Sequence, residues 1–305
     1  MAVITTGSFP KALWPGVNSW WGQSYNQWKP QYTELFEYQK SNKAFEEDVG
    51  HTGFGLAPVK NEGSGVSYDS QTQGFLKRYT NVTYALGFIV TEEQLEDNLY
   101  AIVGKNRTRA LARSMRSTKE TVGANVYNRA FNNSFVGADG LELCSTVHPN
   151  AGGAGGTQQN ELSTAADLSE VALEQACIDI SKWTDDRGIK AAIRPQKIAI
   201  PPDLEYDLCR ILKSYGQSDV DNNNINAMRV MGKFPKGYCV NQYFTDADAW
   251  FIITDAPDGA KYQERIRDSF KQDNDFDTGN AKFKARARYV FGWTDWRGVY
   301  GSPGA

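Results

Sequence analysis

The sequence holds few of the side chains that catalysis uses most often. Its 305 residues include two histidines, His51 and His148, and four cysteines with no Cys-x-x-Cys pair among them. The cysteines are far apart in the chain: Cys144, Cys177, Cys209 and Cys239. In a reducing compartment, isolated thiols of this kind are small core residues. This composition predicts neither a metal site nor a cofactor.

Long apolar runs are also missing. No stretch approaches the ~18 consecutive apolar residues that a membrane-spanning helix requires. Residues 1–10 lack the basic start and apolar core of a signal peptide. We therefore expect a protein that is made in the cytoplasm and has no membrane partner.

A strong charge of either sign is absent too. Lys and Arg total 33 against 36 for Asp and Glu, which leaves a formal net charge of -3. Affinity built on nucleic-acid phosphates usually requires a marked positive excess, so such affinity is not expected. With 40% hydrophobic and 23% charged residues, the chain is a folded protein that is long enough for two packed lobes.

Three local patterns could indicate chemistry, and each falls short. Cys144 and His148 lie four residues apart, as in a thiol–imidazole pair, but Pro149 and the turn-like setting oppose a shared helical face. The glycine-rich residues 152–156 lack the Lys-Ser/Thr of a phosphate loop and predict a flexible loop. Residues 219–224 are rich in Asp and Asn but lack the ligand spacing of a calcium loop. We predict no catalytic or metal-binding residue.

The first 50 residues hold half of the eight tryptophans: Trp14, Trp20, Trp21 and Trp28. No helical or strand period runs through residues 1–30, so this segment cannot bury its own rings. Two interpretations stay open. The segment is either an arm that packs on its own domain or an arm laid over a neighbouring copy.

Residues 53–87 predict a long hairpin. The period-two pattern of a strand runs through Val82, Tyr84, Leu86, Phe88 and Val90. Residues 61–74 are polar and glycine-rich, and a two-stranded ribbon is marginal alone in water. We therefore expect the ribbon to rest on another surface.

A long helix is predicted from a capping box at Thr91 to about residue 134. Forty residues would span ~60 Å, with Gly104 or Gly123 as possible bends. A narrow apolar stripe is formed by Leu99, Val103, Leu111, Met115, Thr118, Val122 and Val126. The remaining positions are rich in cations: Lys105, Arg107, Arg109, Arg113, Arg116, Lys119 and Arg129. We interpret the cations as a solvated or inter-subunit face, with a surface facing nucleic acid as the alternative.

The second half of the chain alternates helices and strands. Residues 168–184 predict an amphipathic helix whose buried face comprises Val171, Leu173, Ala176, Ile180 and Trp183. A buried strand at 196–200 precedes a helix opened by Pro201 and Pro202, in which Leu204, Leu208 and Leu212 share a face. Further strands are predicted at 238–240, 250–253 and 282–289, the last with one basic and one buried face.

Three segments carry a resemblance to a known family. Residues 139–149, DGLELCSTVHP, resemble the loop after the long helix of tailed-bacteriophage major capsid proteins. Residues 194–212, RPQKIAIPPDLEYDLCRIL, resemble the start of their axial domain. Residues 283–302, FKARARYVFGWTDWRGVYGS, are similar to their closing strands, particularly in Mu-like head subunits. The order of the elements also matches over nearly the whole chain.

The resemblance implies an α+β protein of the Hong Kong 97-type capsid fold. It assigns 1–50 to an N-terminal arm, 51–90 to an extended loop, 91–185 to a peripheral domain with a long spine helix, 186–275 to an axial domain, and 276–305 to strands that return to both domains. The expected inter-subunit contacts are Trp20, Trp21, Trp28, Lys60, Phe75, Lys77 and Arg78. No partner asparagine for a covalent cross-link from Lys60 or Lys77 is identified.

The implied function is self-assembly into the icosahedral head shell, with the protein located in the virion. The expected partners are copies of the chain in pentamers and hexamers, portal, scaffolding and decoration proteins, and packaged double-stranded DNA held by non-specific contact. The arm begins almost at Met1, which favours a separate scaffolding protein or none over a cleaved leader. The alternatives are a cellular nanocompartment shell of the same fold, a Cys/His hydrolase, and a ring-forming adaptor of the virion.

Overall fold

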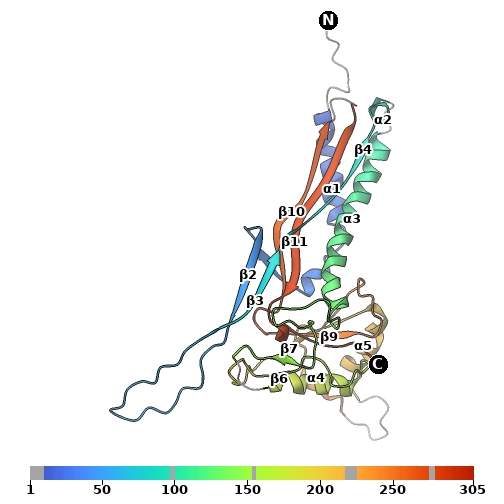
Figure 1. Ribbon diagram of the computed structural model, residues 1–305. Helices are drawn as coiled ribbons and strands as arrows, with labels where there is room; N and C mark the ends of the chain where they lie inside the picture. The colour runs from blue at the N-terminus through green and yellow to red at the C-terminus, as the bar shows by residue number, and fades with distance from the viewer. Residues whose placement is uncertain (1–9, 97–99, 153–155, 217–224, 275–278) are drawn as a thin grey trace.

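The computed structural model describes residues 10–96, 100–152, 156–216, 225–274 and 279–305. Figure 1 shows an elongated molecule in which a long lobe of helices and strands joins a compact lobe at one end, and a thin ribbon projects to the side. The chain passes between the two lobes more than once. The lobes are therefore interleaved, as the sequence predicted.

The long lobe is built on a four-stranded sheet with the order β1-β10-β11-β4. The strands are β1 Glu37–Lys40, β10 Ala260–Asn274, β11 Ala281–Trp293 and β4 Val82–Val90. β1 is parallel to β10, and the other neighbours are antiparallel. Along β11, the aromatic and alanine side chains are buried while the alternating Lys and Arg side chains point outward. The predicted closing strand with one basic face is confirmed.

Helix α3, Tyr100–Asn128, is the spine of this lobe and has 29 residues. The helix ends earlier than the expected length of about 40 residues would place it. The backbone amides of Ala130 and Asn132 bond to carbonyl oxygens three residues earlier, so single turns replace the α-helix there. A short helix α2, Glu92–Glu96, precedes it, and residues 97–99 between the two lie outside the described part. Leu111 and Met115 are buried against the sheet as predicted. The side chains of Leu99 and Val103 are not described.

The N-terminal segment forms a helix that the sequence did not predict. Helix α1, Pro10–Tyr25, packs along α3 and β10. Pro10 at its first position suits a helix start, whereas Pro15 and Gly16 in its interior hide the helical pattern in the sequence. Packing overrides these weak local preferences, because tertiary burial supplies most of the stability of a helix in a protein.

Two cations of α3 are buried within the chain, contrary to the prediction that the basic residues form a solvated or inter-subunit face. Lys119 is 1% exposed and forms an ion pair with Asp268 of β10. The hydroxyl of Tyr25 donates to the same carboxylate at 2.7 Å. Arg116 is also buried and lies 3.4 Å from Glu120. A buried charge is tolerated only where it is paired, and here the pairing joins α1, α3 and β10.

The compact lobe contains a second sheet, with the order β12-β9-β7-β8. Its elements are β7 Pro195–Ile200, β8 Tyr238–Val240, β9 Trp250–Thr254, β12 Val299–Ser302, α4 Glu170–Lys182, α5 Glu205–Lys213 and α6 Ala227–Met231. The strands predicted at 196–200, 238–240 and 250–253 are confirmed, as is the helix after Pro202. The burial of Val171 was wrongly predicted, because this side chain is 70% exposed on α4.

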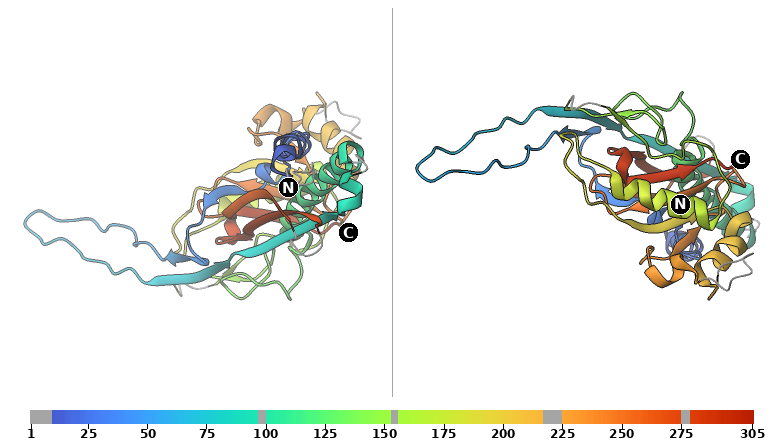
Figure 2. Two further views of the ribbon diagram at one scale, coloured as in Figure 1. Left: turned by 90° about the horizontal axis from the view of Figure 1, so that it is seen from above. Right: turned by 90° about the horizontal axis from the view of Figure 1, so that it is seen from below.

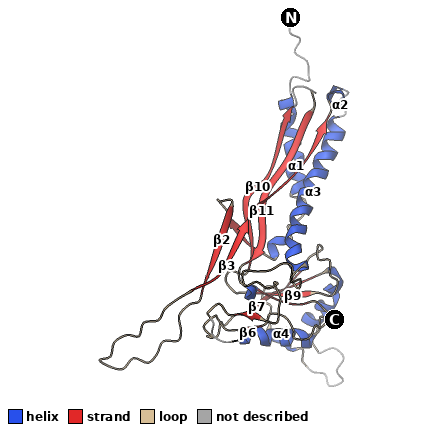
Figure 3. Ribbon diagram, viewed as in Figure 1, coloured by secondary structure: helices blue, strands red, loops and turns tan. Residues whose placement is uncertain are grey.

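The ribbon starts with two antiparallel strands, β2 Phe45–His51 and β3 Gln73–Thr80. The predicted hairpin of residues 53–87 was therefore out of register, because its second strand is β3 while β4 belongs to the long sheet beside β11. Residues 52–72 between β2 and β3 contain no helix or strand (Figure 3). They form an open loop that extends far from both lobes (Figure 2).

The sheets divide the chain differently from the sequence ranges of the expected domains. β10 lies within the range 186–275 but belongs to the long sheet. α4 lies within 91–185 but packs in the core of the compact lobe, together with Leu208 and Ile200. The segment 276–305 contributes β11 to one sheet and β12 to the other. The division of the chain into arm, loop, peripheral and axial domains stays a prediction, and the two sheets do not follow its sequence ranges.

The buried pair of Lys119 and Asp268 gives a stability prediction. Lys119→Met should lower the free energy of unfolding by about 3–5 kcal/mol, because it leaves Asp268 buried and unpaired. Lys119→Met with Asp268→Asn should recover most of this loss in urea unfolding of the unassembled chain.

The matched control is Arg210→Met, which breaks the exposed pair with Asp207 and should change the free energy of unfolding by less than about 1 kcal/mol. Equal losses for Lys119→Met and Arg210→Met would show that the buried pair does not hold the three elements together.

Candidate assembly surfaces

The ribbon exposes apolar side chains that the chain does not cover. Val59 is 95% and Tyr68 is 94% exposed. Three more large apolar side chains in this loop are also exposed: Phe54, Leu56 and Val66. Exposed apolar groups concentrated in one segment mark an interaction surface rather than ordinary surface variation. The ribbon tip is therefore built to be covered by something outside its own chain.

The root of the ribbon is fixed, in contrast to its tip. Asp48 of β2 accepts hydrogen bonds from the buried Lys261 of β10 at 2.5 Å and from Thr294 at 2.9 Å. Further out, Arg187 forms an ion pair with Asp69 at 2.9 Å. The backbone amides of Gly55 and Ser70, together with Arg187, lower the pKa of Asp69. These contacts set the direction in which the ribbon projects.

A second open surface is the outward face of the long sheet. Helices α1 and α3 pack against one face, while the other bears Lys282, Lys284 and Arg286 of β11 in register with Ile89, Gly87 and Ala85 of β4. All six residues are exposed. Lys271 of β10 lies opposite Lys284 in the strand register and extends the row of cations. The surface combines a basic row on β11 with the apolar row of Ala85, Gly87 and Ile89 on β4.

The compact lobe carries two further apolar surfaces on different elements. Val171 and Ile178 are exposed on α4, seven residues apart and therefore on one face of the helix. The second surface surrounds α6 and includes Tyr215, Ile225, Val230 and Met231. Two different surfaces on one lobe are what a subunit needs to contact two different neighbours in a ring.

The three tryptophans predicted as contacts lie in different surroundings. Trp21 is 7% exposed and stacks on Phe270 at 5.0 Å between ring centroids, so its ring packs within its own chain. Trp20 is half-buried and packs against the same core. Trp28 is 51% exposed, and the guanidinium of Arg113 lies 5.7 Å from the centre of its ring.

The other four predicted contacts lie along the ribbon. Lys60 is exposed in the loop. Phe75 is half-buried at the root. Lys77 lies 4.9 Å from the ring of Trp293, and Arg78 pairs with Glu47 at 2.6 Å. Of the seven predicted contacts, Trp28, Lys60 and Arg78 are exposed, and the structure does not bring all seven together.

Cys144 and His148 do not form a catalytic pair. Both are fully buried. The ring nitrogens of His148 bond to Asp139 at 2.5 Å and to the side-chain oxygen of Asn160 at 3.0 Å, while its ring stacks on Trp296. Burial raises the pKa of Cys144 well above its usual value, which disfavours the thiolate that a nucleophile requires.

Asn160 explains why this histidine is buried. Its amide nitrogen donates to the carbonyl oxygens of Leu143, Trp296 and Val299, and its side-chain oxygen accepts from the amide of Ser145. The histidine and the asparagine together join the 139–149 loop to the end of the chain. Their role is to hold these segments together.

The remaining candidate patterns give no site in the described part of the chain. Residues 153–155 of the glycine-rich run and the whole of 219–224 lie outside the described residues. Where the structure is described, no group of three or more His, Cys, Asp or Glu side chains is arranged to hold a metal ion. Within the same residues, no helix is both long and apolar enough to cross a membrane.

The sequence did not reveal that α1 and α3 enclose a polar groove beside Trp28. A usable signal was present: from Tyr100 to Lys119 the sequence has six Lys or Arg and no Asp or Glu. The missing information was the position of α1, which the sequence did not predict as a helix.

Comparisons with known proteins agree with this architecture. The sequence model of a family described as phage capsid protein matches residues 76–302, which is well over half of the chain. The chain therefore belongs to the phage capsid protein family. No curated protein sequence matches it.

Solved structures show the same fold at low sequence identity. A subunit from the procapsid of bacteriophage JBD30 has a TM-score of 0.53 and 15% identity, covering 98% of this chain and 76% of that one. A chain from the capsid of an empty GTA particle has a TM-score of 0.52 and 13% identity, with coverage of 89% and 88%. A chain from Mycobacterium phage Che8 has a TM-score of 0.51 and 13% identity, covering 90% of this chain and 92% of that one.

These findings define the protein class. The fold is α+β, of the Hong Kong 97-type capsid fold. As a member of this family, the chain is a protein of a phage capsid. Neither the nanocompartment shell nor the hydrolase is better supported.

The buried state of Cys144 gives a reactivity prediction. In the native unassembled chain at pH 8, a disulfide-exchange reagent should modify Cys209 first, because burial raises the pKa of Cys177 and Cys239 to about 11 and raises that of Cys144 well above its usual value. Cys144 should react at least ~10-fold more slowly than Cys209 and become equally reactive in denaturant.

Cys209→Ser should remove the fast phase of the reaction. A fast phase that is lost instead on Cys144→Ser would revive the nucleophile hypothesis.

Proposed function

We propose that subunits assemble by inserting the ribbon of one copy onto the outward sheet face of the next. The observation that carries this proposal is the concentration of exposed apolar side chains at residues 54–68 of a ribbon whose root is fixed. Burial of a large apolar side chain contributes roughly 1.5–3 kcal/mol. Several such side chains per ribbon supply enough free energy to join subunits while each contact stays reversible.

The sheet face fits this role by shape and chemistry. Ala85 and Gly87 lie beside Lys284 and Arg286, so the small side chains leave a track along β4 that is bordered by long basic ones. Aromatic rings such as Tyr68 can pack on the stems and cations of Lys and Arg. Lys60, which is exposed in the loop of the ribbon, belongs to this interface.

Ring formation is assigned to the compact lobe. The α4 surface with Val171 and Ile178 contacts the α6 surface of the next copy, and repetition of this heterologous contact closes pentamers and hexamers. Trp20 and Trp21 contribute indirectly by packing α1 onto its own lobe. The resulting division corresponds to an arm at 1–50, an extended loop, a peripheral lobe and an axial lobe.

The remaining partners and the place of synthesis are part of the same proposal. We propose synthesis in the host cytoplasm, a portal at one vertex, scaffolding and decoration proteins as accessory factors, and packaged double-stranded DNA held without sequence preference. The net charge of -3 supports a wall that encloses a genome without binding it tightly.

Removal of the ribbon tip tests the first interface. Deletion of residues 57–67 keeps the pair of Asp69 and Arg187 and should leave the unfolding transition unchanged while abolishing closed particles in electron micrographs. A full-length variant with serine at Phe54, Leu56, Val59, Val66 and Tyr68 should also fail to form particles. Normal particles from either variant would contradict assembly through the apolar ribbon.

A charge reversal tests the sheet face. Lys284→Glu should raise the concentration at which particles form by about tenfold, because an unfavourable charge at every ribbon contact costs ~1.4 kcal/mol or more. Lys236→Glu, an equal charge change at an exposed position of the compact lobe, is the control and should assemble at nearly the parental concentration. The same threshold for both variants would exclude the sheet face as the acceptor.

A further inference from the structure

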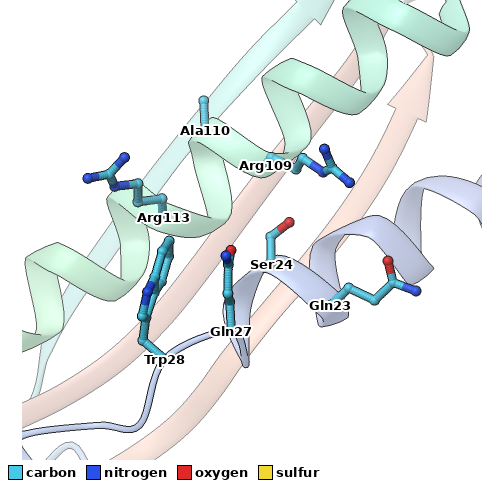
Figure 4. A pocket seen from close by; sticks show the side chains of 7 residues that line it. All are labelled: Gln23, Ser24, Gln27, Trp28, Arg109, Ala110 and Arg113. Carbon is cyan, nitrogen blue, oxygen red and sulfur yellow. The ribbon is translucent and has the colours of Figure 1, made fainter.

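A groove runs between the end of α1 and the middle of α3, on the side of the long lobe that the helices cover (Figure 4). One wall is formed by Gln23, Ser24 and Gln27, and the other by Arg109 and Arg113. The cavity measures about 540 Å³, and Trp28 stands at its end. The side chains that line it are polar or cationic, apart from Ala110 and the indole.

The groove continues beyond Trp28. A second hollow of about 400 Å³ shares Trp28 and Arg113 with the first and extends to Gln242 and Tyr243 of the compact lobe. Arg116 donates to the carbonyl oxygen of Trp28 at 3.2 Å, which holds the backbone while the indole stays half-exposed. The indole is therefore a fixed aromatic anchor between two hollows.

The exposed charged side chains that line the groove are cationic. Arg109 is exposed and has no hydrogen-bond or ion-pair partner among the described residues, and the guanidinium of Arg113 lies 5.7 Å from the centre of the Trp28 ring. Glu120 is the acid that lines the second hollow, but it is 3% exposed. Its two oxygens accept the amides of Gln31 and Tyr32, at 3.0 and 2.9 Å, so they are already occupied.

Shape distinguishes the partners that such charge could attract. A DNA duplex is a wide, rigid cylinder that would meet the exposed guanidinium groups at the rim and leave the indole and the glutamines unused. A single polypeptide segment is narrow enough to enter. Arg109 and Arg113 are one helical turn apart, ~6 Å along α3, which is close to the ~7 Å between alternate side chains of an extended chain.

The ribbon of a second copy does not supply the matching charge. Between residues 52 and 72 its acids are Glu62 and Asp69, and Asp69 is paired with Arg187. Lys60 offsets Glu62. A groove lined by two exposed arginines requires a partner segment that is more acidic than the ribbon.

We propose that this groove binds an acidic segment of a second protein, whose carboxylates pair with Arg109 and Arg113 and whose apolar side chain packs on the indole of Trp28. Gln23 and Gln27 donate to or accept from the backbone of the segment. Arginine and tryptophan are the residue types that most often dominate interface energies, and both line this groove. The proposal goes beyond self-assembly, because the partner is not another copy of this chain.

The test uses the full-length unassembled chain and a fluorescein-labelled peptide, Glu-Ser-Glu-Phe-Glu-Ser-Glu, followed by fluorescence anisotropy at low salt. The peptide should bind, and Trp28→Ala or the double change Arg109→Ala with Arg113→Ala should weaken binding about tenfold. Arg129→Ala, which removes an exposed arginine just beyond α3, is the matched control and should leave the affinity within about twofold. Unchanged thermal unfolding of each variant confirms that the fold is intact.

Four results would overturn the proposal. The first is no saturable peptide binding, and the second is an equal loss of affinity in Arg129→Ala. The third is a short DNA duplex that binds with the same dependence on Trp28. The fourth is a Trp28→Ala variant that binds the peptide normally but no longer forms particles, which would identify a second copy as the occupant. Failure of peptide binding with normal particle formation leaves the proposed assembly intact, so the two hypotheses are separable.

Discussion

The ion pair between Lys119 and Asp268 is the constraint on which the long lobe depends. Three tyrosine rings, those of Tyr32, Tyr262 and Tyr289, surround the ammonium group at 5.1–6.0 Å. A charge in such surroundings has no access to water, so it is stable only while helix and sheet keep their relative positions. The hydroxyl of Tyr25 on α1 donates a hydrogen bond to the same carboxylate. The pair therefore fixes the relative positions of the helices and the sheet, and an elongated lobe with a small cross-section stays rigid.

Because the long lobe is rigid, the surfaces that it leaves uncovered have defined positions. A ribbon whose root is bonded to β10 through Lys261 projects in one direction, and its apolar tip is therefore held at a defined place relative to the lobe. The helices cover one face of the sheet and leave the other, with Lys284 and Arg286, open. A subunit of this kind buries its core efficiently and still exposes apolar groups at its edges. In the proposed assembly, neighbouring copies cover these groups, and the free energy is spread over several modest contacts so that misplaced subunits can dissociate.

Local pattern was sufficient wherever an element is defined by its own residues. The alternation of β11, the apolar strand at β7 and the proline-initiated helix α5 were all predicted close to their observed positions. Prediction failed where distant residues decide. Helix α1 contains Pro15 and Gly16 and exists because its aromatic rings pack on β10. The partner of β4 is β11, almost 200 residues away, so the sequence assigned the wrong partner to the hairpin.

By itself, the sequence determined the class of the protein. The class followed from the resemblance of residues 139–149, 194–212 and 283–302, and of the order of the elements, to a known family, because such motifs can be read from the sequence without knowing the contacts between distant segments. The tertiary structure decided which charges are buried and which remain available. Lys119 and Arg109 lie on the same helix with the same kind of neighbours in sequence, yet one is enclosed by tyrosines and the other lines an open groove. Only the packing of α1 and β10 around α3 distinguishes them, since burial is set by contacts between segments that are far apart in the chain.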